Sequence, residues 1–213
     1  MYSVGYSGLR LSVRLLQGNK GKKMKNVLLL LANGFETYEA SVFIDVLGWN
    51  LTDGDKNTQL FTCGMTCEIK SSFNIIVKPD YLIDNIDVIN FDALAIPGGF
   101  EEYSFYDDAY SEPFLDLIRK FHTSRKTIAS ICVAALPLGK SGILNGKKAT
   151  TYRGKRQAQL KEFGATVIDE PIVIDENIIT SWNPSTAIPV ALLLLESLTT
   201  KTNSEKIKKL MGF

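Results

Sequence analysis

Apolar residues along this chain follow two alternating patterns, one typical of buried strands and the other of amphipathic helices. Residues 26–32, NVLLLLA, form a short apolar run of the kind found in a strand that is buried on both faces. In residues 37–51 the apolar positions recur at helical spacing instead. The broad stripe predicted to face the core comprises Ala40, Phe43, Ile44, Val46, Leu47 and Leu51.

The same alternation continues along the chain. Further strands are predicted at 58–64, 126–132, 148–152, 165–168, 172–175 and 177–181, with a hairpin at 68–80 and a strand in 91–99 that ends in a Pro-Gly-Gly turn. Helices are predicted at 112–124, 134–144, 154–164, 187–199 with Thr186 as N-cap, and 204–213. Strands that alternate with helices predict an α/β fold, in which helices cover both faces of a mostly parallel sheet.

Ligands of such folds bind in the loops that follow the carboxyl ends of the strands. Three loops are therefore of interest. They are NGFETYE after the first strand, PGGFEEYSF after the strand in 91–99, and CVAA after the strand at 126–132.

Composition narrows the classes of function. The 213 residues include 24 basic and 23 acidic ones, so charge gives no reason to expect nucleic-acid or membrane binding. No apolar run reaches the roughly 18 residues that a membrane span needs. Three cysteines, an odd and low count, argue against a disulfide framework and indicate a reducing, cytoplasmic setting. Cys63 and Cys67 have no second pair nearby, so we expect no metal site and no cofactor.

Residues 1–23 differ from the rest of the chain. They hold five basic residues and no acidic ones, and Met24 then opens a segment that resembles a natural protein start. A cloning remnant or tag, an upstream start codon and an organellar targeting segment are three interpretations, and we favour the first two. Residues 24–213 are predicted to form a single domain.

Cys132 lies at the junction of the strand at 126–132 and the helix that follows. Small residues around it, Ser130, Ala134 and Ala135, leave room for a sharp strand-to-helix turn that presents the side chain at the top of the sheet. The positive end of the following helix would favour the thiolate, which is the reactive form. The alternative is a plain buried cysteine, since free cysteines are among the most buried residues.

Four segments resemble the ThiJ/PfpI superfamily in order and spacing over about residues 25–200. They are LLLLANGFETYEA, FDALAIPGGF, ASICVAALPLGKSGILNGKKATTY and IITSWNPSTAIPVALLLLESL. The resemblance implies a flavodoxin-like three-layer sandwich related to class I glutamine amidotransferases, and a homodimer.

The resemblance also implies roles for individual residues. Cys132 would be the nucleophile, and Glu39 would be the carboxyl group that hydrogen-bonds it. The backbone N–H groups of Gly99 and Val133 would form an oxyanion pocket. For Glu39 the alternative is a helix acid that is stabilised by the macrodipole. For the glycines it is an ordinary turn in which Gly98 and Gly99 supply positive φ angles.

The sequence departs from the superfamily in its histidines. Proteases of the superfamily have a histidine directly after the cysteine, where this chain has Val133, and its deglycases have one where this chain has Tyr152. The single histidine, His122, falls in a predicted surface helix. A Cys–His dyad is therefore not expected, which disfavours peptidase- or amidotransferase-like hydrolysis.

Three hypotheses of function follow. The first is glyoxalase- or deglycase-like chemistry of Cys132 on a small reactive carbonyl compound such as methylglyoxal. The second is an oxidative-stress sensor or chaperone with little turnover, in which Cys132 is reversibly oxidised. The third and weakest is a diverged hydrolase.

Aromatic residues are dense in the loop after Gly99, which runs FEEYSFYDDAY. Phe100, Tyr152 and Trp182 are candidates to line a small pocket near Cys132. A lid packed on the sheet edge, or a contact between two copies, explains the same residues equally well.

Overall fold

The computed structural model describes residues 23–213, in which a seven-stranded sheet forms the centre. Its strands, in spatial order, are β10 (Ile172–Asp175), β11 (Ile178–Ser181), β7 (Thr127–Ser130), β6 (Ala93–Ile96), β1 (Lys25–Leu31), β2 (Thr58–Gly64) and β5 (Tyr81–Leu82). All neighbouring strands are parallel except β10 and β11. The predicted α/β fold with a mostly parallel sheet is confirmed.

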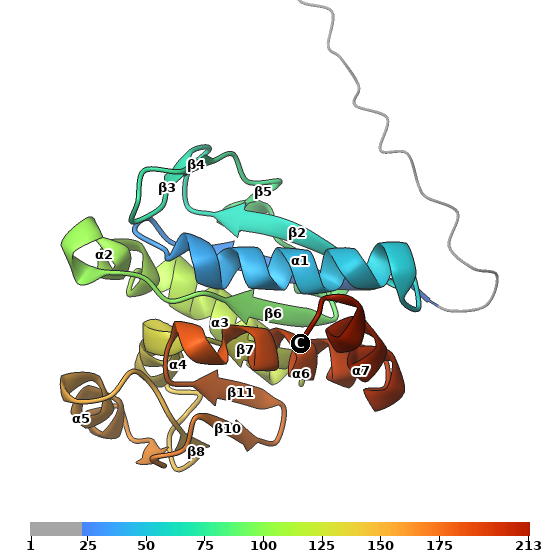
Figure 1. The fold of residues 1–213 in the computed structure, drawn as a ribbon. Helices are drawn as coiled ribbons and strands as arrows, with labels where there is room; N and C mark the ends of the chain where they lie inside the picture. Colours follow the sequence, from blue (N-terminus) through green and yellow to red (C-terminus); the bar gives the residue numbers. More distant parts are fainter. Residues whose placement is uncertain (1–22) are drawn as a thin grey trace, which may run out of the picture.

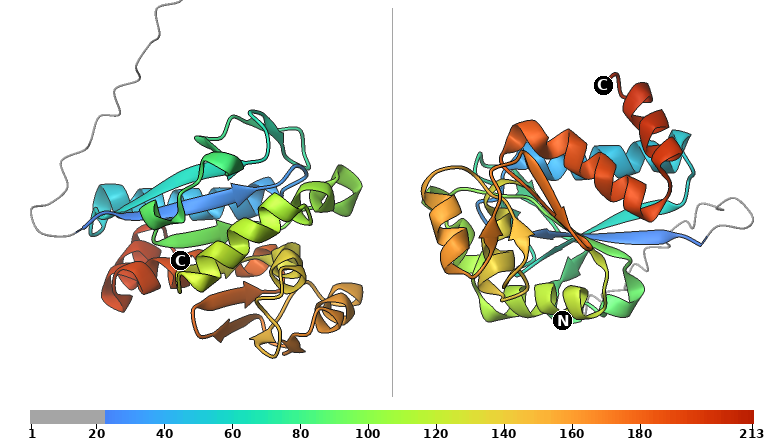
Figure 2. Two further views of the ribbon diagram at one scale, coloured as in Figure 1. Left: turned by 180° about the vertical axis from the view of Figure 1, so that it is seen from behind. Right: turned by 90° about the horizontal axis from the view of Figure 1, so that it is seen from below.

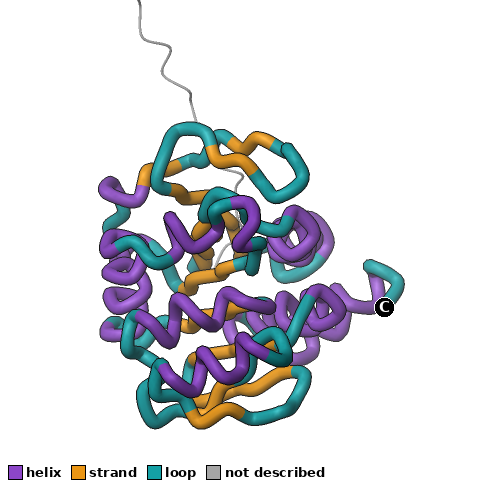
Figure 3. Tube along the Cα trace, turned by 90° about the vertical axis from the view of Figure 1, so that its left-hand side faces the viewer, coloured by secondary structure: helices purple, strands orange, loops and turns teal. Residues whose placement is uncertain are grey.

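Helices cover both faces of this sheet, which gives three layers (Figures 1 and 2). One face carries α1 (Thr37–Asp53), α6 (Ala187–Leu198) and α7 (Lys201–Leu210), which pack against one another. The other face carries α3 (Glu112–Thr123) and α4 (Ala135–Lys140), with α2 (Phe105–Ala109) and α5 (Lys155–Glu162) beside them. Figure 3 shows the strands as a column with helices on either side.

The core explains why the central strands are apolar without interruption. Residues 27–31 of β1 are at most 1% exposed, because β1 has a neighbouring strand at each edge and helices over both faces. In α3, the apolar side chains of Phe114, Leu115, Ile118 and Phe121 are buried against the sheet.

Two small sheets lie outside the main one. The predicted hairpin at 68–80 is formed by β3 (Ile69–Lys70) and β4 (Ile76–Val77). The strands predicted at 148–152 and 165–168 are present but shorter. They are β8 (Lys148–Ala149) and β9 (Thr166–Val167), which pair with each other. β5 was not predicted, because two exposed residues carry no periodicity.

The structure corrects two details of the sequence prediction. Ile44 is 45% exposed, because the core-facing stripe of α1 is narrower than the run of apolar residues implied. Thr186 occupies the N-cap position of α6, as predicted, but its side chain makes no capping hydrogen bond. Its hydroxyl donates to the Asn183 carbonyl instead, within a short 3-10 turn at Pro184–Thr186 that leads into the helix.

The structure adds one negative finding about membranes. Between residues 23 and 213 no helix has both the length and the apolar character needed to cross a bilayer. The predicted extension at residues 1–23 lies almost entirely outside the described residues.

Candidate functional site

Cys132 occupies a sharp turn between β7 and α4. Its φ angle is 59°, in the left-handed region that residues other than glycine rarely adopt. Cys132 starts a single 3-10 turn that ends at Ala134, and α4 follows directly. The Thr151 hydroxyl, which is fully buried, donates to the Cys132 carbonyl at 2.9 Å and so helps to hold the strained residue.

Glu39 lies in the first turn of α1, and its side chain is completely buried. The backbone N–H of Gly98 donates to its Oε2 at 2.6 Å, and the carboxyl group lies close enough to the Cys132 thiol for each group to shift the pKa of the other. Glu39 Oε1 has no hydrogen-bond partner among the described residues. The Glu36 N–H donates to the Gly98 carbonyl at 2.8 Å, which ties the start of α1 to the Pro-Gly-Gly loop. Three loops from three different strands thus meet at the thiol.

Burial determines the protonation of this pair. It raises the pKa of Glu39 to about 8, with a further contribution from the charge of Glu36, while the Gly98 N–H and Cys132 oppose the shift. Burial also raises the pKa of Cys132, as does the negative charge of Glu39, and the Val133 N–H lowers it. At neutral pH the Glu39 carboxyl is mostly protonated, so it can donate a hydrogen bond to a thiolate.

Two backbone N–H groups of the cavity lining, those of Val133 and Gly99, have no competing backbone acceptor among the described residues. Val133 N–H interacts with the Cys132 sulfur. Gly99 and Phe35 form an isolated antiparallel β-bridge. The hydrogen bonds of this bridge are donated by the N–H groups of Glu36 and Phe100. Within residues 23–213 the Gly99 N–H therefore has no backbone partner. These two donors have the character that an oxyanion pocket needs.

The glycines of the Pro-Gly-Gly loop are required by close packing. Neither Gly98 nor Gly99 has a positive φ angle, so the ordinary-turn interpretation is wrong. A Cβ on Gly98 would lie 2.9 Å from the Cys132 Cβ and 2.9 Å from Glu39 Oε2. A Cβ on Gly99 would lie 2.3 Å from the Gly34 carbonyl oxygen. Glycine here lets the loop approach the Cys132–Glu39 pair.

Substitution of Gly98 by alanine is expected to destabilise the fold by about 1–3 kcal/mol and to slow alkylation of Cys132, because the new methyl group must separate the thiol from Glu39. Gly48→Ala is the matched control, since a Cβ there meets nothing within 4 Å and alanine favours helix α1. Urea unfolding and labelling with iodoacetamide give both readouts. Equal behaviour of the two variants would contradict the packing argument.

A cavity of about 400 Å³ opens onto Cys132. Of the residues predicted for the site, Cys132, Val133, Gly99, Phe100 and Tyr152 line it, while Glu39 lies beneath, next to the thiol. The volume suits a small molecule.

Trp182 does not line this cavity, contrary to the prediction. The Arg153 guanidinium carbon lies 3.7 Å from the centroid of the Trp182 ring, and Arg153, not Trp182, lines the cavity. The other aromatic side chains of the loop after Gly99 differ in their exposure to solvent. Phe105 is fully buried, whereas Tyr103 is exposed and packs with Phe73 and Phe100.

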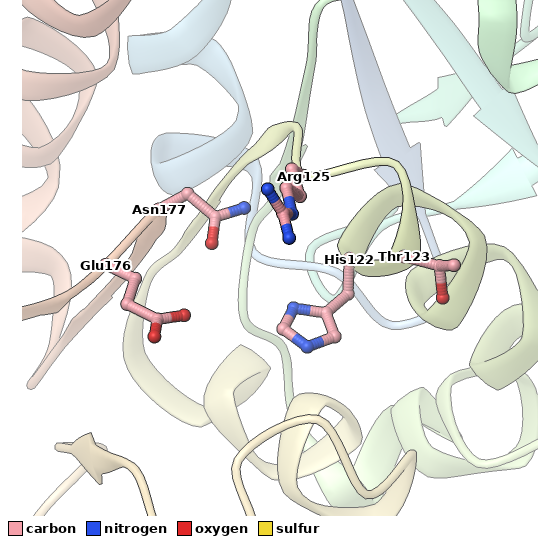
Figure 4. Close-up of a pocket in the computed structure, with 5 residues that line it drawn as sticks. All are labelled: His122, Thr123, Arg125, Glu176 and Asn177. Carbon is pink, nitrogen blue, oxygen red and sulfur yellow. The ribbon is translucent and has the colours of Figure 1, made fainter.

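His122 lies far from the thiol. It lies in the last turn of α3, near the amino end of β7, where it lines a separate cavity of about 690 Å³ together with Arg125, Glu176 and Asn177 (Figure 4). The whole length of β7 separates His122 from Cys132. Within one chain, therefore, no histidine can take a proton from the thiol.

Residues of the cavity that sequence reasoning missed are Arg153, Lys155 and Arg156, together with Glu101 and Glu102. The dense basic run RGKR was visible in the sequence, but its nearness to Cys132 depends on how the loop before α5 folds. Among the described residues, no group of three or more histidine, cysteine or acidic side chains is placed to hold a metal ion.

The other two cysteines have ordinary environments. Cys63 is buried in β2, and burial raises its pKa to about 12. Cys67 is exposed and provides an internal reference for experiments on Cys132.

Comparison with known proteins gives a consistent result. The model of the DJ-1/PfpI family matches residues 25–197. Protein DJ-1alpha of Drosophila melanogaster is 31% identical over 199 residues, which is 92% of this chain and 87% of that protein. Deglycase PfpI of Pyrococcus furiosus is 33% identical over 108 residues, 51% of this chain and 63% of that protein. The crystal structure of Drosophila melanogaster DJ-1beta has a TM-score of 0.77 at 28% identity, covering 88% of this chain and 97% of that one.

Proposed function

Because this chain belongs to the DJ-1/PfpI family, as its sequence motifs predicted, we propose that it converts small reactive dicarbonyl compounds by glyoxalase- or deglycase-like chemistry at Cys132. The observation that carries the proposal is the buried contact between Cys132 and Glu39 at an open cavity. One relative, deglycase PfpI, has a name consistent with chemistry of this class.

In the proposed reaction, the Cys132–Glu39 pair has first lost one of its two protons to solvent. The sulfur then attacks the aldehyde carbon of an α-oxoaldehyde as the thiolate, while Glu39 carries the remaining proton. A sulfur–carbon bond forms, the carbonyl electron pair moves to oxygen, and the oxygen takes the proton that Glu39 carries, which gives a hemithioacetal. The N–H groups of Gly99 and Val133 stabilise the developing oxyanion.

Glu39, now a carboxylate, then acts as the base. It removes the proton from the carbon that is bonded to sulfur and delivers it to the neighbouring carbon, while the hydroxyl proton of the first carbon passes to the oxygen of the second. The hemithioacetal is thereby isomerised to an α-hydroxy thioester. Water adds to the thioester carbon, the carbon–sulfur bond breaks and the thiolate leaves. The proton that water loses returns to Glu39, and an α-hydroxy acid is released. One carboxyl group thus supplies the proton transfers for which a histidine is often used.

The product of methylglyoxal tests the proposal. Proton NMR of the protein with excess methylglyoxal, and no added thiol, is expected to show lactate accumulating well beyond one equivalent of protein. Consumption of no more than one equivalent, without lactate, would sink the catalytic proposal, because it would mean that Cys132 only traps the aldehyde.

A second candidate is reversible oxidation of Cys132 in an oxidative-stress response. The specific observation in its favour is the protonated Glu39 carboxyl, which can donate a hydrogen bond to an oxidised sulfur. Peptide mapping by mass spectrometry after mild peroxide treatment is expected to find Cys132 modified first. The candidate fails if Cys63 or Cys67 is oxidised while Cys132 stays unmodified.

A further inference from the structure

Three positively charged side chains form one wall of the cavity that holds Cys132. Arg153, Lys155 and Arg156 come from a stretch of only four residues, and all three line the cavity. The proposed reaction at Cys132 gives none of them a role. We call this set the basic wall.

Two of these side chains are held in place by aromatic rings. The Arg153 guanidinium lies 3.7 Å from the centroid of Trp182, and Arg156 lies 4.9 Å from that of Tyr106. Arg156 also donates to Glu101 Oε2 at 2.6 Å, and its side chain is only 13% exposed. Stacking orients a guanidinium before any ligand arrives, which lowers the entropy that binding must overcome.

The position of the basic wall runs against the polarity of its helix. Lys155 and Arg156 are in the first turn of α5, which has no acidic residue there, and Gly154 at the N-cap offers no side-chain acceptor. The N-terminal end of a helix carries partial positive charge, so acidic side chains stabilise it and basic ones do not. The basic residues at the start of α5 are therefore a local conflict of the kind retained at functional sites.

Three carboxylates, those of Glu36, Glu101 and Glu102, also line the cavity and equal the basic side chains in number. Glu101 accepts from both Arg156 and Lys155, at 2.6 and 3.5 Å. Arg153 is 3.3 Å from Asp169, which lies outside the cavity lining. Glu36 also lines the cavity, but its charge acts at the opposite side, on Glu39 and Cys132. Glu102 is exposed at the rim.

We propose that the substrate of Cys132 carries an oxyanion group, a carboxylate or a phosphate, which Arg153 and Lys155 bind while the aldehyde carbon lies at the thiol. The substrate class is then an anionic α-oxoaldehyde, and this inference rests on the proposed function for its carbonyl chemistry. A guanidinium presents two parallel N–H groups, the geometry that carboxylate and phosphate oxygens match.

Two alkylating reagents that differ only in charge test the basic wall without requiring catalysis. Iodoacetate and iodoacetamide both form a sulfur–carbon bond as iodide leaves, and mass spectrometry separates the labelling of Cys132 from that of exposed Cys67. The rate ratio of iodoacetate to iodoacetamide is expected to be higher at Cys132 than at Cys67. Arg153→Gln and Lys155→Gln are each expected to lower the Cys132 ratio about three- to ten-fold, less so in high salt.

The matched control is Lys161→Gln, at the exposed far end of α5, which should leave the Cys132 ratio unchanged. Equal ratios at Cys132 and Cys67, or a ratio that neither cavity variant alters, would overturn the proposal. If neither iodoacetate nor iodoacetamide alkylates Cys132, calorimetric titration with inorganic phosphate and with acetate tests the anion site instead. If the wild type binds either ion and the double variant Arg153→Gln/Lys155→Gln does not, the result supports an oxyanion site. The ion that binds identifies the ligand as phosphate or carboxylate. Absence of binding, or binding that the double variant retains, overturns it.

Turnover separates this inference from the function on which it rests. Hydroxypyruvaldehyde phosphate is expected to have a higher kcat/KM than uncharged methylglyoxal, and the double variant should remove the difference through KM. Turnover of methylglyoxal with no preference for the anionic substrate would overturn the anion site alone. A preference for iodoacetate with no turnover of either aldehyde would overturn the carbonyl chemistry and leave the anion site standing.

Discussion

Replacement of Cys132 by serine is expected to lower the conversion of methylglyoxal to lactate by on the order of a thousand-fold or more. A serine hydroxyl is far less acidic than a thiol, and in this buried position no histidine is available to take its proton. The two side chains are nearly the same size, so the turn at residue 132 is retained. Lactate formation, measured by NMR at equal protein concentration, gives the effect.

Cys67→Ser is the control for this variant, because Cys67 is exposed and has no part in the cavity. It should convert methylglyoxal at the wild-type rate. If Cys132→Ser and the wild type form lactate equally fast, Cys132 is not the nucleophile and the proposed function fails.

Substitution of Glu39 by glutamine is expected to reduce turnover by about a hundred- to ten-thousand-fold, the usual contribution of a positioned acid–base group. Glutamine can accept from the Gly98 N–H and donate to the sulfur, so the hydrogen bonds are preserved. It cannot remove the carbon-bound proton of the hemithioacetal. Trapping of aldehyde by Cys132 should therefore continue while lactate formation stops.

Glu39→Gln lowers turnover, but at alkaline pH it is expected to raise the free energy of unfolding. The pKa of Glu39 rises from 4.5 to about 8 on folding, so the folded state holds a proton that the unfolded state releases in this range. The contribution of Glu39 to the stability of the wild type is thus greatest below pH 4.5 and falls by up to about 1 kcal/mol for each pH unit until about pH 8. Glu39→Gln should lack this loss and be the more stable protein at pH 8.

Urea unfolding of both proteins at several pH values measures this difference. Asp45→Asn, an equal change of charge on the exposed face of α1, is the control and should follow the wild type. A parallel pH dependence in the wild type and Glu39→Gln would mean that Glu39 ionises normally in the folded protein.

The general fold could be predicted because the core strands and helices are long and regularly patterned. Val27 to Leu31 read as a buried strand, and the structure buries them on both faces. Cys132 could be predicted as a site residue from a local signal, because small residues surround it where the strand pattern changes to a helix pattern. Glu39 has no comparable local signal, and its pairing with Cys132 came from the resemblance to a family.

What the sequence could not reveal depends on contacts between distant segments. Trp182 was predicted to line the pocket, but its face is covered by Arg153, which comes from a loop 29 residues earlier in the chain. Gly98 and Gly99 look like turn residues, while their actual role is to admit Cys132, Glu39 and Phe105 at close range. The homodimer that the resemblance implies is still a prediction.

The most direct test of the Cys132–Glu39 pair is the pH dependence of kcat/KM for methylglyoxal, which reports the ionisations of the free protein. In the wild type, kcat/KM is expected to rise with a midpoint at about pH 8, where the pair loses its first proton. In Glu39→Gln this inflection should disappear along with most of the activity. A wild-type profile without an ionisation near pH 8, or the same midpoint in Glu39→Gln, would contradict the assignment of these two residues as one acid–base unit.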